Sequence, residues 1–137
     1  MKAVRDLVPH AGRMCLLDEV LEWDANAIAC RASSHRDRGN PLRGAGGLAA
    51  VMGVEYAAQA VAAHGTLIQE IFQPRIGYLA ALRDIACFVE RLDTERQDLV
   101  IRATRVAAES GRLLYDFRVE CEARELLKGR LSVVLSK

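Results

Sequence analysis

The chain has 137 residues, of which 51% are hydrophobic, 27% charged and only 5% aromatic. Its 19 basic and 18 acidic side chains give a formal net charge of +1, which argues against a broad surface for nucleic acid or an anionic membrane. The length fits a single domain over residues 1–137, and the composition excludes a disordered or collagen-like chain.

In chain order, the residue pattern predicts two strands, a polar loop, one long helix and then four strands. The first two strands are predicted at 13–23 and 25–33, the loop at 34–47 and the helix at 48–64, with Gly65 as a left-handed C-cap. Further strands are predicted at 77–89, at 99–107, after the turn 109–112, and at 126–135.

The fifth strand has the clearest periodicity in the sequence. Apolar residues at 115, 117, 119, 121 and 123 alternate with charged residues at 116, 118, 120, 122 and 124. A period of two indicates an antiparallel sheet with one buried face. We therefore expect an α+β fold with the single helix on one face of the sheet, and free sheet edges that favour a dimer.

From the sequence we expect no signal peptide, membrane span or metal site. Its most apolar stretch, 46–63, is interrupted by Glu55 and Gln59 and falls short of the roughly 20 apolar residues that a span needs. The cysteines lack ligand spacing and are expected to be small core residues in a reducing cytoplasm: Cys15, Cys30, Cys87 and Cys121.

Glu55 is the unusual residue of the predicted helix, which is apolar nearly all round. Partial burial would raise the pKa of such a carboxyl group and suit it to proton transfer, and Gln59, one turn on, could hydrogen-bond the same site. The alternative is a carboxylate that reaches a helix edge or pairs with an arginine of the sheet. The surrounding alanines and glycine leave room either for close helix packing or for a slender ligand.

Four segments in the same order resemble the hotdog-fold 3-hydroxyacyl-acyl-carrier-protein dehydratases. They are L-V-P-H-A-G-R-M-C-L-L-D-E-V at 7–20, G-V-E-Y-A-A-Q-A at 53–60, G-Y-L-A-A-L-R-D at 77–84 and the final G-R-L-S-V-V-L. The sequence is most similar to the dehydratase-like hotdog proteins of aryl polyene gene clusters.

This resemblance implies a curved antiparallel sheet of five to six strands wrapped around one long central helix. It also implies that Glu55 acts on the substrate hydroxyl, and that backbone N–H groups around Gly46, Gly47 and Leu48 polarise the thioester carbonyl. The acyl chain would arrive on the phosphopantetheine of an acyl carrier protein or of CoA, so no metal or nucleotide cofactor is expected. The functional unit would be a dimer or higher oligomer with sites across the interface.

The loop before the helix departs from the family pattern. The G-H-F-P-G motif is absent, and Pro41 stands where its histidine would lie, fourteen residues before Glu55. His35 is the candidate general base, whereas His10 is expected to be structural and His64 to lie at the surface near the helix C-terminus. Asn40 could orient a thioester or a water molecule, or could simply start a turn.

The resemblance and these residues together leave three functions open. The first is a 3-hydroxyacyl thioester dehydratase with Glu55 as acid and His35 as base. The second is a half-catalytic or non-catalytic partner of a paralogous hotdog subunit, and the third is an acyl-thioester hydrolase. Arg36, Arg38 and Arg43 could dock a pantetheine phosphate or an acidic carrier protein, or could form a solvated loop face.

Overall fold

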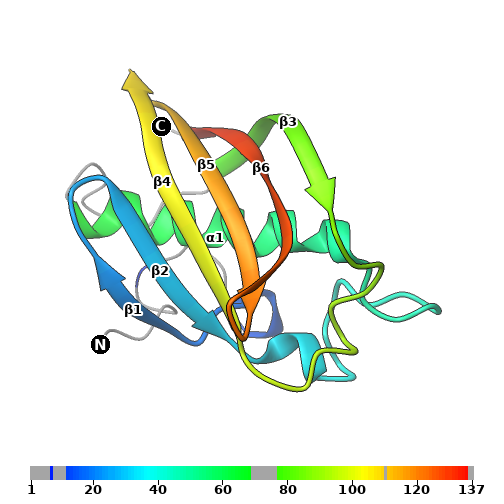
Figure 1. The fold of residues 1–137 in the computed structure, drawn as a ribbon. Helices are drawn as coiled ribbons and strands as arrows, with labels where there is room; N and C mark the ends of the chain where they lie inside the picture. Colours follow the sequence, from blue (N-terminus) through cyan, green and yellow to red (C-terminus); the bar gives the residue numbers. More distant parts are fainter. Residues whose placement is uncertain (1–6, 8–11, 69–76, 110, 136–137) are drawn as a thin grey trace.

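The computed structural model describes residue 7 and residues 12–68, 77–109 and 111–135. One antiparallel sheet has the strand order β1-β2-β4-β5-β6-β3. Its strands are β1 (Glu19–Trp23), β2 (Ala27–Ala32), β3 (Gly77–Cys87), β4 (Leu99–Glu109), β5 (Arg112–Cys121) and β6 (Arg124–Leu135). Figure 1 shows α1 (Gly53–Leu67), the one α-helix of the described residues, crossing one face of this curved sheet, which is the predicted hotdog arrangement.

Strand β5 confirms the predicted period of two. Its residues Leu113, Tyr115, Phe117 and Val119 are buried, and between and after the last three of them the charged residues Asp116, Arg118 and Glu120 point to the opposite face. Ion pairs such as that between Arg130 and Asp116, with Nε–Oδ1 at 2.7 Å, cover that outer face. The sheet is therefore half buried, as the alternation requires.

Helix α1 is buried over most of its length because its residues are small. Ala57, Ala60 and Ala63 are fully buried, and Gly53 lies so close to β6 that an added Cβ would be 2.7 Å from Leu127 Cδ2. This close approach lets the sheet wrap tightly around the helix.

Several predicted boundaries were wrong. A 3₁₀ turn over Ala50–Met52 precedes α1, and Gly65 lies inside the helix rather than capping it, because the helix continues to Leu67. The first strand begins at Glu19, since Gly12–Met14 forms a 3₁₀ turn. In the described part of the chain, no helix is long and apolar enough to cross a membrane.

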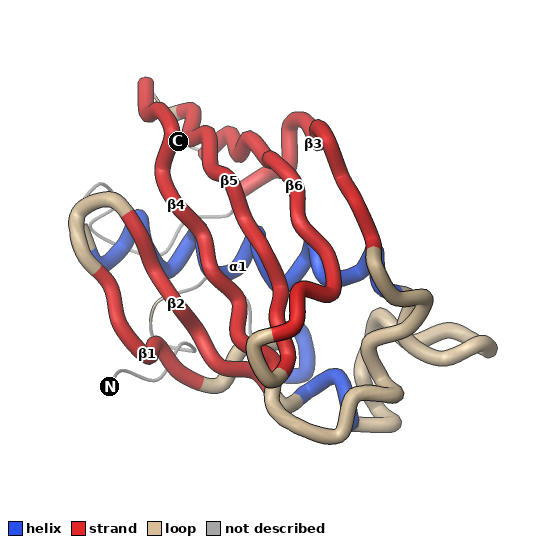
Figure 2. The backbone as a smooth tube through the Cα atoms, viewed as in Figure 1, coloured by secondary structure: helices blue, strands red, loops and turns tan. Residues whose placement is uncertain are grey.

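The loops that surround the start of α1 gather at one end of the molecule. The segment between β2 and α1 and the segment between β3 and β4 both lie at this end, as Figure 2 shows. Two main-chain hydrogen bonds join them, from Ala50 N to Glu90 O and from Leu92 N to Leu48 O, each 2.9 Å long. This end of the fold therefore brings together the residues predicted to carry function.

Candidate active site

Glu55 lies in the first turn of α1, and its side chain is exposed. A partly buried carboxylate is therefore not observed, and the side chain reaches the surface of the helix, as the alternative interpretation expects. The residues on either side of it, Val54 and Tyr56, are buried, so the helix turns its one acidic side chain outward. Two apolar side chains of neighbouring segments are also exposed: Val51, one turn earlier, is 47% exposed, and Phe88, two residues before the Glu90 that pairs with Ala50, is 55% exposed.

Gln59 does not share a site with Glu55. It is buried, its Oε1 accepts a 2.8 Å hydrogen bond from the Leu16 N–H, and its Nε2 donates to the Met14 carbonyl. The amide therefore joins α1 to the segment before β1. A substrate contact by Gln59 would require breaking these bonds.

His35 lies in a short 3₁₀ turn, Ser34–Arg36, directly after β2, and its side chain is fully buried. Its Nε2 lies 3.1 Å from the Glu95 carbonyl, which can only accept, so Nε2 carries the proton in the neutral ring. Nδ1 has no hydrogen-bond partner within the described residues. The imidazole is therefore enclosed by its own chain, and its basic nitrogen, Nδ1, accepts no hydrogen bond from the described residues.

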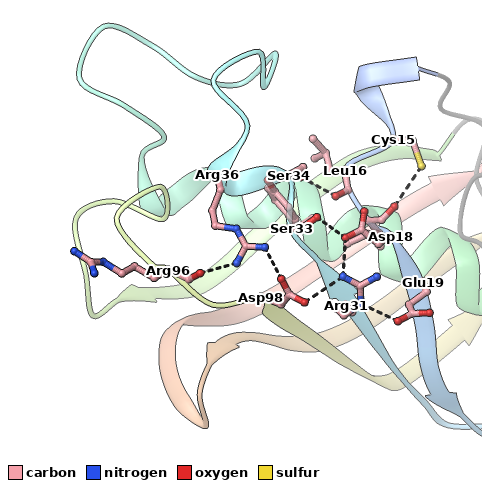
Figure 3. A network of polar contacts seen from close by, with 12 residues as sticks. Cys15, Leu16, Asp18, Glu19, Arg31, Ser33, Ser34, Arg36, Arg96 and Asp98 are labelled. Carbon is pink, nitrogen blue, oxygen red and sulfur yellow. Dashed lines mark hydrogen bonds and ion pairs between the residues drawn. The ribbon is translucent and has the colours of Figure 1, made fainter.

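The polar network in Figure 3 fixes the backbone around His35. The Arg36 guanidinium bonds Asp98 Oδ1 and the Arg96 carbonyl, both at 2.7 Å. Arg31 bonds Asp98 Oδ2 at 3.1 Å and also pairs with two carboxylates near β1, those of Asp18 and Glu19. The turn that holds His35 is thus tied to β2 and to the segment before β4.

Burial and the neighbouring Arg36 lower the pKa of His35, against the opposing effect of nearby carbonyls and Asp98. The pKa of a histidine in the unfolded chain is about 6.5, so below that pH the unfolded chain binds a proton more readily than the folded chain does. We therefore expect the free energy of unfolding to include the full contribution of a neutral, buried His35 above about pH 6.5. This contribution is lost as the pH falls from there through the lowered pKa of the folded state. Urea unfolding measures the effect. Between pH 7.5 and pH 5.5, the free energy of unfolding should fall less for His35→Gln than for the wild type, and an equal fall would contradict this assignment.

Asn40 is buried and takes part in a continuous chain of hydrogen bonds. Its Nδ2 donates to Tyr56 Oη at 3.0 Å, Tyr56 Oη lies 2.8 Å from Ser34 Oγ, and Ser34 Oγ donates to the Leu16 carbonyl at 2.7 Å. Since the one hydroxyl proton of Ser34 goes to that carbonyl, Tyr56 donates to Ser34. Asn40 Oδ1 also accepts from the Leu42 N–H at 2.8 Å, which fits the turn interpretation. Nδ2 also donates to the Ser34 carbonyl at 2.9 Å, so both of its hydrogens are engaged and none is left to bind a thioester in this arrangement.

The main-chain N–H groups before α1 are partly engaged within the chain. Gly47 N donates to Gly44 O at 3.1 Å, and Leu48 N donates to Asp93 Oδ1 at 2.9 Å. The prediction that these two groups polarise a substrate carbonyl is therefore not supported by the geometry. Gly46, at the tip of the same loop, is exposed.

The remaining histidines and cysteines form no metal site among the described residues. His64 is buried rather than exposed as predicted, with Nδ1 2.5 Å from Tyr115 Oη and Nε2 2.8 Å from the Asp24 carbonyl. His10 lies outside the described residues. Two cysteines are buried and one is half-buried as expected of core residues, but Cys87 is exposed.

Sequence reasoning missed three residues that shape this region: Ser34, Tyr56 and Asp93. Each of them also makes a hydrogen bond to a residue 18 or more positions away, and no local motif identifies such a contact. Of the three loop arginines, Arg36 pairs with Asp98 and Arg43 with Asp93, whereas Arg38 is exposed and makes no ion pair in the described part of the chain.

Comparison with known proteins identifies the family. A family model described as ApeP dehydratase, of the ApeP-like family, matches residues 2–137. The chain belongs to the ApeP-like dehydratase family. Its function is accordingly dehydratase-like, on a hotdog fold, and the predicted relationship to the aryl polyene cluster proteins is confirmed. A search of curated proteins returns no match.

Solved structures similar to this ApeP-like chain share its fold at low sequence identity. The dehydratase heterocomplex ApeI:P from Xenorhabdus doucetiae matches with a TM-score of 0.87 at 22% identity, over 100% of this chain and 93% of that one. AziG from S. sahachiroi matches with a TM-score of 0.65 at 14% identity, over 96% and 98% of the two chains. A thioesterase from Haemophilus influenzae matches with a TM-score of 0.62 at 12% identity, over 87% and 78%.

Proposed function

We propose that this chain supplies the helix carboxylate Glu55 to a 3-hydroxyacyl thioester dehydratase whose site is completed by a second hotdog subunit. The observation that carries the proposal is the outward position of Glu55 on a helix that is otherwise buried. An exposed carboxylate at the start of the central helix is available to a substrate held between two protomers.

The reaction is an elimination of water. A base removes a proton from the carbon next to the thioester carbonyl, the C2–C3 double bond forms, and the C3 hydroxyl leaves as water with a proton supplied through Glu55. The acyl group arrives on the phosphopantetheine of an acyl carrier protein or of CoA, in the cytoplasm, and no further cofactor takes part.

The base is assigned to the second subunit because His35 is enclosed by its own chain. The ring is fully buried and hydrogen-bonded to the Glu95 carbonyl, and the loop lacks the G-H-F-P-G motif. The similar structure from Xenorhabdus doucetiae is described as a dehydratase heterocomplex, which supports a paralogous hotdog chain as the partner.

Exposed apolar side chains on the helix start, on β3 and just after it support a covering protomer. Val51 and Phe88 leave about half of their side chains exposed, and Leu82 on the edge strand β3 is 41% exposed. Strand β3 lies at one end of the sheet, so its outer edge can pair with another strand. A partner seated here would bury the apolar side chains and enclose the carboxylate.

Reconstitution tests the proposal. The purified chain is assayed alone, with the neighbouring paralogous hotdog subunit, and beside that subunit alone, on a 3-hydroxyacyl thioester. We expect enoyl thioester from the mixture and co-elution of the two chains in size-exclusion chromatography. Equal turnover by the paralogous subunit alone would contradict a catalytic contribution from this chain.

Nδ1 of His35, which has no hydrogen-bond partner among the residues that the structure describes, favours a second arrangement, in which the chain is a homodimer and His35 is the base. The ring is held neutral, as a general base must be. Turnover by the chain alone that is lost in His35→Gln, with the fold intact, would assign the base to His35. No turnover by the chain alone would exclude this arrangement.

The products separate dehydration from hydrolysis, because solved structures of similar fold include a thioesterase. Free acid and free thiol would indicate that a carboxylate activates water for hydrolysis. A 2-enoyl thioester with no free thiol would indicate elimination.

Arg38 is the loop arginine best placed to meet an acidic carrier protein, because Arg36 and Arg43 already pair with carboxylates. We expect Arg38→Glu to lower kcat/KM for a carrier-linked substrate by about three- to tenfold, and that for a short thiol analogue hardly at all. Arg118→Glu, on the outer face of the sheet, is the control. Equal losses on both substrates would contradict carrier docking at Arg38.

A further inference from the structure

Asp93 is a buried carboxylate in the connection between β3 and β4, and only 4% of its side chain is exposed. The Arg91 guanidinium holds it through two parallel bonds, Nε to Oδ1 at 3.1 Å and the terminal nitrogen to Oδ2 at 2.5 Å. Arg43 approaches the same Oδ2 at 3.4 Å, and the Leu48 N–H donates to Oδ1 at 2.9 Å. One carboxylate therefore joins the segment after β3 to both ends of the glycine-rich loop before α1.

Gly47 shows how closely the loop is pressed against this ion pair. Its φ is +99°, and an added Cβ would lie 2.6 Å from Arg91 Nε and 2.7 Å from Asp93 Oδ2. A larger residue would both strain the backbone and displace the guanidinium or the carboxylate. The loop thus fits one position against Asp93.

Main-chain pairing continues this contact up to the start of the helix. Ala49 and Arg91 form an antiparallel bridge, and Leu48 and Leu92 on either side of it are fully buried. Asp93 lies at the end of this short ladder, where its carboxylate accepts the hydrogen bond from the Leu48 N–H. A carboxylate that accepts from a main-chain N–H and from arginine forms strong, charge-assisted bonds.

We propose that Asp93 is a positioning residue, which fixes the loop 43–48 and thereby the point at which α1 begins and Glu55 meets the substrate. This inference rests on the proposed function of Glu55. Leu48, the direct partner of Asp93, precedes Glu55 by seven residues, so a shift of the loop passes into the first turn of the helix. A small displacement of a reacting group is enough to reduce turnover strongly.

The test uses the complex with the second hotdog subunit and compares Asp93→Ala, Asp93→Asn, Asp116→Ala and Glu55→Gln. Asp116 is the matched control, because it makes the same two-bond pair with an arginine but lies on the outer face of the sheet, 53% exposed. The measurements are kcat and KM on a 3-hydroxyacyl thioester, thermal unfolding, and hydrogen exchange of the Leu48 N–H.

We expect Asp93→Ala to accelerate exchange at Leu48 and to lower kcat by about ten- to a hundredfold, with KM changed by less than about threefold. Asp93→Asn keeps an acceptor for the Leu48 N–H, so it should restore much of the exchange protection at Leu48 and much of kcat. It also keeps the test decisive if the alanine variant fails to fold. Asp116→Ala should leave kcat within about twofold.

Fast exchange at Leu48 with unchanged kcat in either Asp93 variant would overturn the positioning role. Equal losses of kcat in the Asp93 and Asp116 variants would overturn it as well. An active Glu55→Gln complex would instead overturn the proposed function, so the two failures are distinguishable.

Discussion

Replacing Glu55 by glutamine should reduce dehydration of a 3-hydroxyacyl thioester by about 10²- to 10⁴-fold in the complex with the second subunit. Glutamine keeps the length and shape of the side chain but cannot carry a proton between the enzyme and the leaving hydroxyl. Because Glu55 is exposed and makes no ion pair within the described residues, the free energy of unfolding should change by less than about 0.5 kcal/mol.

The measurement is kcat on matched preparations, with thermal unfolding and co-elution with the partner as checks on folding and assembly. Glu109→Gln is the control, since Glu109 is also exposed but lies at the far end of β4. It should behave as the wild type. Full activity of Glu55→Gln would remove the carboxylate from the reaction, whereas loss of co-elution would assign Glu55 to the interface.

The antiparallel sheet and the single helix could be predicted because their patterns are local. The alternation along β5 reflects one buried and one exposed face of the same strand, and the run of helix formers from Leu48 onward contains no strong breaker. Strand β1 was predicted too long because apolar residues such as Leu16 and Leu17 are buried without belonging to a strand.

The positions of Glu55 and Gln59 could not be predicted from the helix alone. A helix that is apolar nearly all round has no hydrophobic face that indicates which side turns outward. Tertiary contacts determine which side chain is buried: Gln59 is buried and accepts a hydrogen bond from the Leu16 N–H, whereas Glu55 faces outward. His64 was misplaced for the same reason, since its partner Tyr115 is 51 residues away.

The sequence singles out Glu55 as the one acidic residue of the helix, but not the contacts that surround the start of that helix. The helix signature and the glycine-rich segment before it adjoin in the chain and lie at one end of the fold. The contacts that hold this end, from Asp93 to Leu48 and from Tyr56 to Ser34, join residues 45 and 22 positions apart. Such pairs depend on the fold and leave no pattern in the sequence around them.

Asn40→Ala should lower the free energy of unfolding by about 2–4 kcal/mol. The substitution removes three hydrogen bonds, from Nδ2 to the Ser34 carbonyl and Tyr56 Oη and from the Leu42 N–H to Oδ1. It leaves the Tyr56 hydroxyl without its donor in a buried environment, which adds to the loss. Urea unfolding with the fluorescence of Trp23 as the probe measures the effect.

Asn26→Ala is the matched control, because Asn26 lies exposed in the turn between β1 and β2. Its main-chain N–H donates to Asp24 Oδ1 and its carbonyl accepts from the Arg105 N–H, so neither bond uses the side chain that the substitution removes. It should change the free energy of unfolding by less than about 0.5 kcal/mol. If Asn40→Ala unfolds as the wild type does but loses turnover, Asn40 contacts substrate and the hydrogen-bond chain to Tyr56 contributes little. If it loses stability and keeps turnover per folded molecule, Asn40 is a structural residue of the loop, and the reaction depends on Glu55 and on what the partner brings to it.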